Sequence, residues 1–166
     1  MKFASKIVPC LWFDCQAEDA ARLYTSVFPG GRIVKTSHYF KSGQEVHGGK
    51  PGSVLTVSFE LAGTSFTALN GGPVFRFNEA VSLQVMCDTQ QELDHYWSRL
   101  TEGGDPAAQQ CGWLKDRFGL SWQVVPAVLP DLVTDPDPVK AERAFAAMMQ
   151  MKKLDIAALQ RAHTGA

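Results

Sequence analysis

The sequence predicts an α+β fold made of two β-α-β-β-β modules followed by a C-terminal helical tail. The main observation is an internal repeat, because the pattern D-x-Q-x-E occurs at Asp14 and again at Asp88, each time directly after a short apolar segment. A second observation is that each copy continues with an amphipathic stretch of helical period and then with a Gly-Gly pair. Extended segments follow in both copies, so a whole module is repeated.

The composition is that of an ordinary folded domain. Of the 166 residues, 45% are hydrophobic and 20% are charged, which suits a core that needs neither disulfides nor a structural metal. The formal net charge is -1 and no segment gathers Lys or Arg, so we expect no binding to nucleic acid. No apolar stretch spans a bilayer and no signal peptide is recognised, so no membrane segment is expected. Four cysteines without a C-x-x-C pair are typical of reduced thiols and predict a cytoplasmic protein.

The first module is predicted over residues 5–70. Residues 6–13 form a short apolar run that is typical of a buried strand. The apolar residues from Ala20 to Val27 follow the i, i+3, i+4, i+7 spacing of a helix, with Asp14 as the expected cap and Gly30-Gly31 as the expected end. Three strands follow, with a polar loop after the first and a tight turn after the second: residues 32–40, 54–61 and 64–70.

The second module is predicted over residues 80–126, and the two modules form one domain over residues 1–130. Its first strand is residues 80–87, and Thr89 with Glu92 forms a capping box that opens a helix. Shorter strands are expected after Gly103-Gly104, at residues 107–110, 111–116 and 120–125. The tail covers residues 131–166, where a helix begins at Pro138.

Several strings resemble the vicinal oxygen chelate superfamily, which includes glyoxalase I, bleomycin-resistance proteins and extradiol dioxygenases. They match its PhnB-like branch, often labelled 3-demethylubiquinone-9 3-methyltransferase, over roughly residues 5 to 126. The strings are KIVPCLWFD (6–14), AARLY (20–24), NGGP (70–73), FRFN (75–78), VSLQ (81–84), CGWLKD (111–116) and GLSWQVVP (119–126).

The resemblance implies that the two modules form curled mixed sheets around a pocket and that the protein is a homodimer. In metal-using relatives the ligands lie on the first and fourth strands of each module. The corresponding positions in this sequence fall near Val8, Ser82 and Gln123, with the remaining one around residues 68–70. Valine cannot ligate a metal, and neutral serine and glutamine are poor ligands for zinc or iron. We therefore expect no metal and no cofactor.

The candidate ligand pocket is defined by the strand faces that the resemblance turns inward. Strand periodicity places alternate residues on one face of each strand. The candidates are Val8, Cys10, Trp12, Ser82, Gln84, Ser121 and Gln123. A few polar groups among apolar ones suit a small organic ligand, whereas the alternative is that the glutamines only satisfy each other or nearby backbone.

Other reactive side chains have simpler explanations. Cys10 and Cys111 have no histidine nearby in sequence, and buried thiols usually act as small apolar groups. His38 could act as an acid or base oriented by Asp14 or Asp116, although these two are better explained as a helix cap and a turn residue. The methionines at 148, 149 and 151 are expected to pack the tail onto the body or a second subunit.

Two functions remain open at this point. The first is a metal-independent protein that binds a small molecule. The alternative is an enzyme, namely a lyase, dioxygenase or transferase that acts on an oxygen-rich or aromatic metabolite, with catalytic residues that the sequence does not identify. A transferase that uses adenosylmethionine commonly has a glycine-rich turn between a strand and a helix, and no Gly-Gly pair in this sequence opens a helix.

Overall fold

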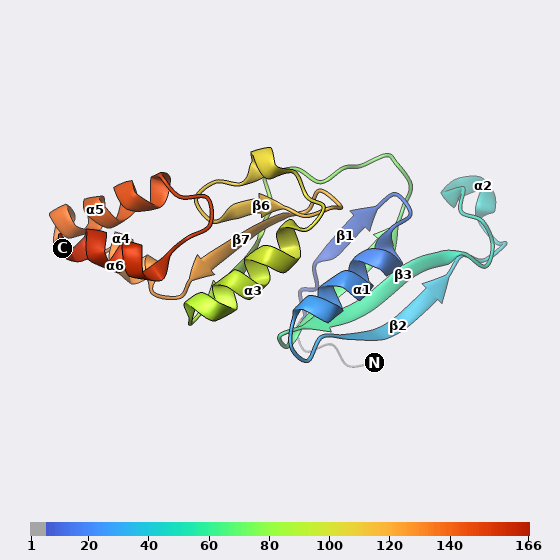
Figure 1. Cartoon of the computed structure of the whole chain (residues 1–166). Helices are drawn as coiled ribbons and strands as arrows, with labels where there is room; N and C mark the ends of the chain where they lie inside the picture. Colours follow the sequence, from blue (N-terminus) through green and yellow to red (C-terminus); the bar gives the residue numbers. More distant parts are fainter. Residues whose placement is uncertain (1–5) are drawn as a thin grey trace. The chain divides into compact units, whose positions relative to one another are not determined.

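The structure is a computed structural model that describes residues 6–166 (Figure 1). Its described backbone divides into two compact units, one ending at Phe77 and one beginning at Asn78. Both are α+β with a mixed sheet, as the sequence predicts. Within residues 6–166, no helix is long and apolar enough to cross a membrane.

The first unit is a four-stranded sheet covered on one face by a helix. The strands β1 (Cys10–Phe13), β2 (Arg32–His38), β3 (Val54–Leu61) and β4 (Thr64–Asn70) lie in the order β1-β4-β3-β2. The pair β1–β4 is parallel and the other pairs are antiparallel. Two register shifts in β2 mark irregularities of the kind that bend a strand, which fits the curled sheet that was expected.

Helix α1 (Ala17–Val27) lies on the sheet (Figure 1). Its buried face consists of alanines, Val27 and Tyr24. Tyr24 is fully buried and its ring lies 6.1 Å from that of Phe59 on β3. The predicted cap is wrong, because Asp14 makes no capping bond and the helix begins after Gln16. Instead the side chain of Asn70 accepts a hydrogen bond from the N–H of Ala17 at 2.8 Å. A residue at the end of β4 therefore replaces the local cap.

Two further features of the first unit concern its connections. The turn between β3 and β4 is the predicted one, since Ala62 and Gly63 both have positive φ angles of 46° and 80°. The loop after β2 contains a short helix, α2 (Gln44–His47), where the sequence predicts only a polar, glycine-rich loop. Left-handed glycines at 43 and 48 flank this helix and confine it to a single turn.

The second unit begins with the repeated strand and helix. Strand β5 (Leu83–Cys87) leads into α3 (Gln90–Thr101), and the predicted capping box is present. The hydroxyl of Thr89 accepts from the N–H of Glu92 at 3.2 Å, and the Glu92 carboxylate accepts from the N–H of Asp88 at 2.8 Å. Leu93 and Leu100 are fully buried on the face that α3 turns to the sheet.

The sheet of the second unit has three strands, because one expected strand does not form. Strands β5, β7 (Ser121–Pro126) and β6 (Trp113–Lys115) lie in the order β5-β7-β6, with β5 parallel to β7. The segment predicted as a strand at 107–110 is instead the 3-10 helix η1 (Pro106–Ala108) and an isolated bridge from Gln110 to Trp113. Asp105 caps η1 and Pro106 begins it, which favours a helical turn.

A buried carboxylate organises the turn before β7. Asp116 is only 2% exposed and accepts hydrogen bonds from the N–H groups of Phe118 (2.9 Å) and Leu120 (3.1 Å). Its second oxygen accepts from the indole N–H of Trp122 at 2.8 Å. The interpretation of Asp116 as a turn residue is thus confirmed, and these bonds explain how the charge is kept in the core.

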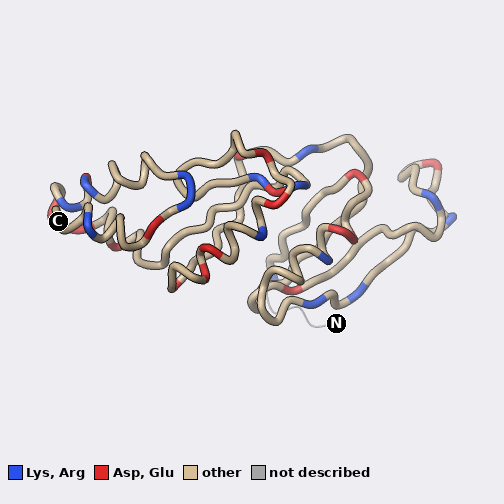
Figure 2. The backbone as a smooth tube through the Cα atoms, in the orientation of Figure 1, with Lys and Arg blue, Asp and Glu red and all other residues tan. Residues whose placement is uncertain are grey.

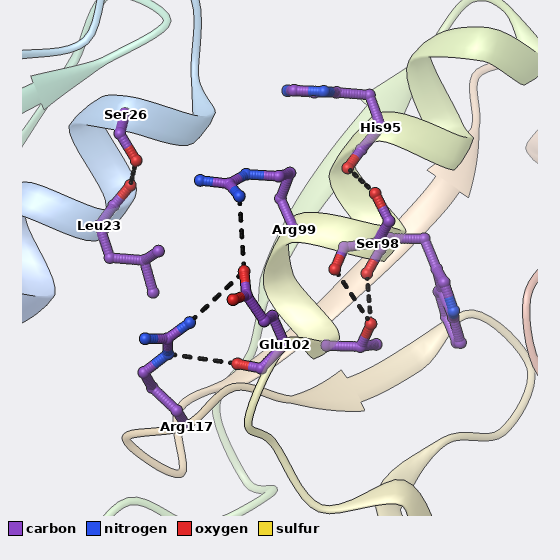
Figure 3. Close-up of polar contacts among 9 residues, drawn as sticks. Leu23, Ser26, His95, Ser98, Arg99, Glu102 and Arg117 are labelled. Carbon is purple, nitrogen blue, oxygen red and sulfur yellow. Dashed lines mark hydrogen bonds and ion pairs between the residues drawn. The ribbon is translucent and has the colours of Figure 1, made fainter.

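The end of α3 is tied to the same turn by charged side chains (Figure 3). Glu102 lies 3.4 Å from Arg99 and 3.6 Å from Arg117, and the Glu102 carbonyl accepts a further hydrogen bond from Arg117 Nε at 3.2 Å. Charges of both signs are also interspersed along each unit (Figure 2). Ion pairs this exposed contribute little to stability individually.

The tail forms helices α4 (Leu129–Val133), α5 (Pro138–Met149) and α6 (Ile156–Thr164), which pack on one another (Figure 1). The predicted start of a helix at Pro138 is confirmed, with Asp137 as its cap. The segment after α5 is bound to the module by hydrogen bonds of 2.8 Å from the N–H of Cys111 to Met151 O and from the N–H of Gly112 to Lys152 O. Packing of the tail on the module, one of the two outcomes expected for its methionines, is therefore observed.

Candidate functional site

The second unit contains a cavity of about 850 Å³ bounded by the sheet, by η1 and by the tail. The two parallel strands β5 and β7 contribute Gln84, Ser121 and Gln123 to its polar lining. Three of the seven predicted pocket residues therefore line one cavity. This size and mixture of polar and apolar groups is typical of sites for small organic molecules.

The two glutamines form a short hydrogen-bonded chain across the strands. Gln84 and Gln123 are direct neighbours in the β5–β7 register. The Gln84 amide donates to Gln123 Oε1 at 3.2 Å, and the Gln123 amide donates to the hydroxyl of Ser82 at 2.8 Å. The alternative that the glutamines satisfy each other is thus partly realised. Ser82 does not line the cavity itself but fixes the amide of Gln123.

Ser121 differs from these residues because its hydroxyl is unpaired. The residue is only 1% exposed, and within residues 6–166 its oxygen has no hydrogen-bond partner. A buried hydroxyl without a partner costs free energy, so such groups are rare in folded proteins. Ser121 lines the cavity, but its oxygen is itself shielded, so a ligand supplies the missing hydrogen bond only after a small shift of the wall.

The remaining lining is mostly apolar, and the tail provides a large part of it. Leu129 and Val133 come from α4, and Met148 and Met149 come from α5. The thiol of Cys111 also borders the cavity, 3.7 Å from the sulfur of Met149. The sequence predicts that the methionines pack on the body or on a second subunit, but it does not place them in a pocket, because helix periodicity does not identify the surface that a helix meets.

The other three predicted pocket residues belong to the first unit. Val8 precedes β1, whereas Cys10 and Trp12 lie on the face of β1 opposite the buried residues Leu11 and Phe13. Trp12 donates from its indole N–H to Gly72 O at 2.8 Å. Partial burial raises the pKa of the Cys10 thiol. Whether these residues face a ligand stays a prediction.

The first unit has its own cavity, of about 640 Å³, which sequence reasoning missed. Asp14, Glu18 and Asp19 at the start of α1 form one side, and Tyr39 with His47 forms another. The two rings lie 4.7 Å apart, and the Tyr39 hydroxyl donates to the carbonyl of Asn70. These groups meet only because the loop after β2 folds back, and no sequence spacing indicates this.

The side chains at the candidate positions suit neither a metal ion nor adenosylmethionine. At the metal positions Val8 has no donor atom, while Ser82 and Gln123 are hydrogen-bonded to each other. No cluster of three or more His, Cys, Asp or Glu suited to a metal occurs among residues 6–166. For adenosylmethionine, the strand-to-helix junctions at residues 14–16 and 88–89 contain no glycine.

The chain matches one family model and several solved structures of known proteins. The family model described as 3-demethylubiquinone-9 3-methyltransferase matches residues 5–125. The PhnB protein from Bacillus cereus is 34% identical, with coverage of 74% of this chain and 100% of that one and a TM-score of 0.63. A Pseudomonas aeruginosa protein is 20% identical, covers 74% and 98% of the two chains, and shares the fold with a TM-score of 0.56. No match is found among curated proteins.

The matched region covers both modules and stops before the tail. The duplicated strand-and-helix pattern, the two mixed sheets and the likeness to PhnB all agree with this assignment. The chain therefore belongs to the 3-demethylubiquinone-9 3-methyltransferase family, the PhnB-like branch of the vicinal oxygen chelate superfamily.

Proposed function

We propose that this protein binds a small organic molecule, without a metal, in the cavity of the second unit. The observation that carries the proposal is the mostly apolar cavity whose wall brings the Gln84–Gln123 pair together with Ser121. A polar group of a ligand would bond to these amides and, after a small shift of the wall, to the buried hydroxyl of Ser121. The Gln84–Gln123 pair lies on the neighbouring positions and adds donors and acceptors beside it.

We propose binding without a metal because the side chains at the positions of metal ligands are poor ligands. Gln123 occupies a position where metal-using relatives have a ligand, and its amide is engaged with Ser82. Serine and glutamine side chains are neutral and weak ligands for zinc or iron, so the cavity offers a ligand hydrogen bonds rather than a Lewis acid. Elemental analysis of protein purified without chelator tests this part, and stoichiometric metal lost on replacing Gln123 would contradict it.

Ser121→Ala is the variant that tests binding. A thermal-shift screen against small metabolites should identify compounds that raise the melting temperature, because a ligand bound only to the folded state stabilises it. Ser121→Ala should weaken the binding of such a compound about 5- to 10-fold, the effect of one neutral hydrogen bond. The variant itself should be as stable as the parent or more so, since it removes an unpaired polar group.

Ser26→Ala is the matched control. Ser26 lies on α1 in the other unit, and its hydroxyl donates to Leu23 O at 2.7 Å (Figure 3). This substitution should leave ligand affinity unchanged. If a library of metabolites gives no shift, or if both serine variants bind every hit as the parent does, the proposed site is wrong.

A further inference from the structure

We propose that the ligand of this cavity is uncharged and largely apolar, and that the tail beyond the family region forms the wall that selects it. This inference rests on the proposed function, since it concerns the same cavity. Two independent observations support it. One is the charge balance of the lining, and the other is the origin of its apolar side.

The lining contains two charged residues among those described, Glu79 and Lys115, and they form an ion pair with each other. The hydrogen bond from Lys115 holds the pKa of the Glu79 carboxyl below its usual range, so that the carboxylate stays ionised beside the ammonium group. A charged ligand would either compete for one partner of this pair or be left without a counter-ion. Glu79 and Lys115 are partly exposed, so the cost falls mainly on a charge placed against the apolar wall, where no counter-ion lies.

The apolar wall comes from residues outside the family match. That match ends at residue 125, whereas Leu129, Val133, Met148 and Met149 lie in α4 and α5. Methionine is flexible and polarisable, so it adapts to the outline of an apolar or aromatic molecule. The wall is therefore a property of this chain and not of the matched region.

The wall is held in place by several bonds to the module. The N–H groups of Cys111 and Gly112 each donate at 2.8 Å to carbonyls of the segment that follows α5. The carbonyl of Leu154 accepts from Gln90 Nε2 at 3.2 Å, and the Leu154 side chain is fully buried. These contacts keep Met148 and Met149 beside the cavity, so they act as a fixed boundary for the ligand.

The test compares three probes of one shape and different charge on the full chain: 2-naphthol, 2-naphthoate and 2-naphthylmethylammonium. Titration calorimetry at neutral pH gives the affinities. We expect 2-naphthol to bind at least about 10-fold more tightly than either ion, the cost of leaving one charge unpaired. Ser121→Ala should weaken 2-naphthol binding, which assigns the binding to this cavity.

Met149→Lys tests the wall itself. Met149 is 41% exposed, so a lysine can be accommodated there, and it would place an unpaired positive charge at the cavity. The preference for 2-naphthol over 2-naphthoate should then fall by about 10-fold. Val139→Lys is the control, because Val139 is on the same helix, is 59% exposed and does not line the cavity.

The outcomes separate this inference from the proposed function. If an ion binds as tightly as 2-naphthol and Ser121→Ala weakens that ion, the cavity is a binding site but the inference is overturned. The inference is also overturned if no probe binds but a charged metabolite does, and Ser121→Ala weakens the binding of that metabolite. If neither probes nor metabolites bind, both proposals fail. Equal effects of Met149→Lys and Val139→Lys would exclude the tail as the selecting wall.

Discussion

The side-chain oxygen of Gln90 accepts a hydrogen bond from the backbone N–H of Ile156 at 2.9 Å. The amide nitrogen of the same side chain donates to Leu154 O at 3.2 Å. A single residue at the start of α3 thus satisfies one backbone group between α5 and α6 and one at the start of α6. Gln90 connects the repeated module to the tail, and Gln16 holds the equivalent place in the first copy of the repeat.

Gln90→Ala should lower the free energy of unfolding by about 1–3 kcal/mol, because it leaves backbone groups of the tail without partners. Urea denaturation followed by tryptophan fluorescence measures the change. Gln16→Ala is the control, since the Gln16 side chain accepts one bond of 3.3 Å from the N–H of Cys15 and is exposed. Its effect should stay below about 0.5 kcal/mol. Equal losses in the two variants would show that Gln90 does not anchor the tail.

Asp116→Ala should lower the free energy of unfolding by about 3 kcal/mol or more, because Asp116 is a buried carboxylate with several hydrogen bonds to N–H groups. Asp116→Asn, which keeps one acceptor oxygen, should cost less. Asp105→Ala is the comparison, since exposed Asp105 accepts one bond from Ala107 and should cost about 1 kcal/mol. Denaturant titration of the three variants gives the order, and a loss at Asp116 no greater than at Asp105 would contradict the assigned role.

Cys87 gives a pH-dependent prediction. Burial, followed by the nearby carboxylates of Glu92 and Asp88, raises the pKa of its thiol from 9.0 to about 12. A thiol with a raised pKa holds its proton more tightly in the folded state, so its contribution is complete below pH 9 and is lost as the pH rises toward 12. The free energy of unfolding should therefore fall over this range, and less so in Cys87→Ala.

The raised pKa of the Cys87 thiol also predicts that this thiol reacts slowly. At pH 8 a thiol reagent should modify exposed Cys15 rapidly, whereas buried Cys87 should react only as the protein unfolds. Mass spectrometry of peptides after timed labelling distinguishes the two sites. Rapid labelling of Cys87 in the folded protein would show that the residue is more accessible than the structure indicates.

We expect the protein to form a homodimer. Within the described residues β1 pairs with β4 alone and β5 pairs with β7 alone, so each sheet keeps an edge strand whose outer side can pair or be covered. Large apolar side chains are also exposed, including Phe40 at 78% and Phe75 at 61%. Light scattering coupled to gel filtration should give twice the chain mass, and a concentration-independent monomer would refute the expectation.

Local patterns determined much of this fold in advance. The repeat at Asp14 and Asp88 predicted both modules, and the capping box at Thr89 and the turn at Ala62-Gly63 are present as predicted. These features depend on neighbours only a few residues away, where side-chain spacing and backbone preference act directly. The hydrogen bond between Gln84 and Gln123 was one of the two alternatives that the sequence left open for these side chains.

Tertiary structure decided the features that join distant parts of the chain. Asn70 caps α1 in place of Asp14, and the last module forms three strands because Asp105 and Pro106 begin a turn. The wall that Met148 and Met149 form depends on where the tail docks. Sequence alone thus determined the periodic elements and their duplication. The three-dimensional packing determined the caps and the cavity, because hydrogen bonds between residues far apart in sequence leave no local pattern.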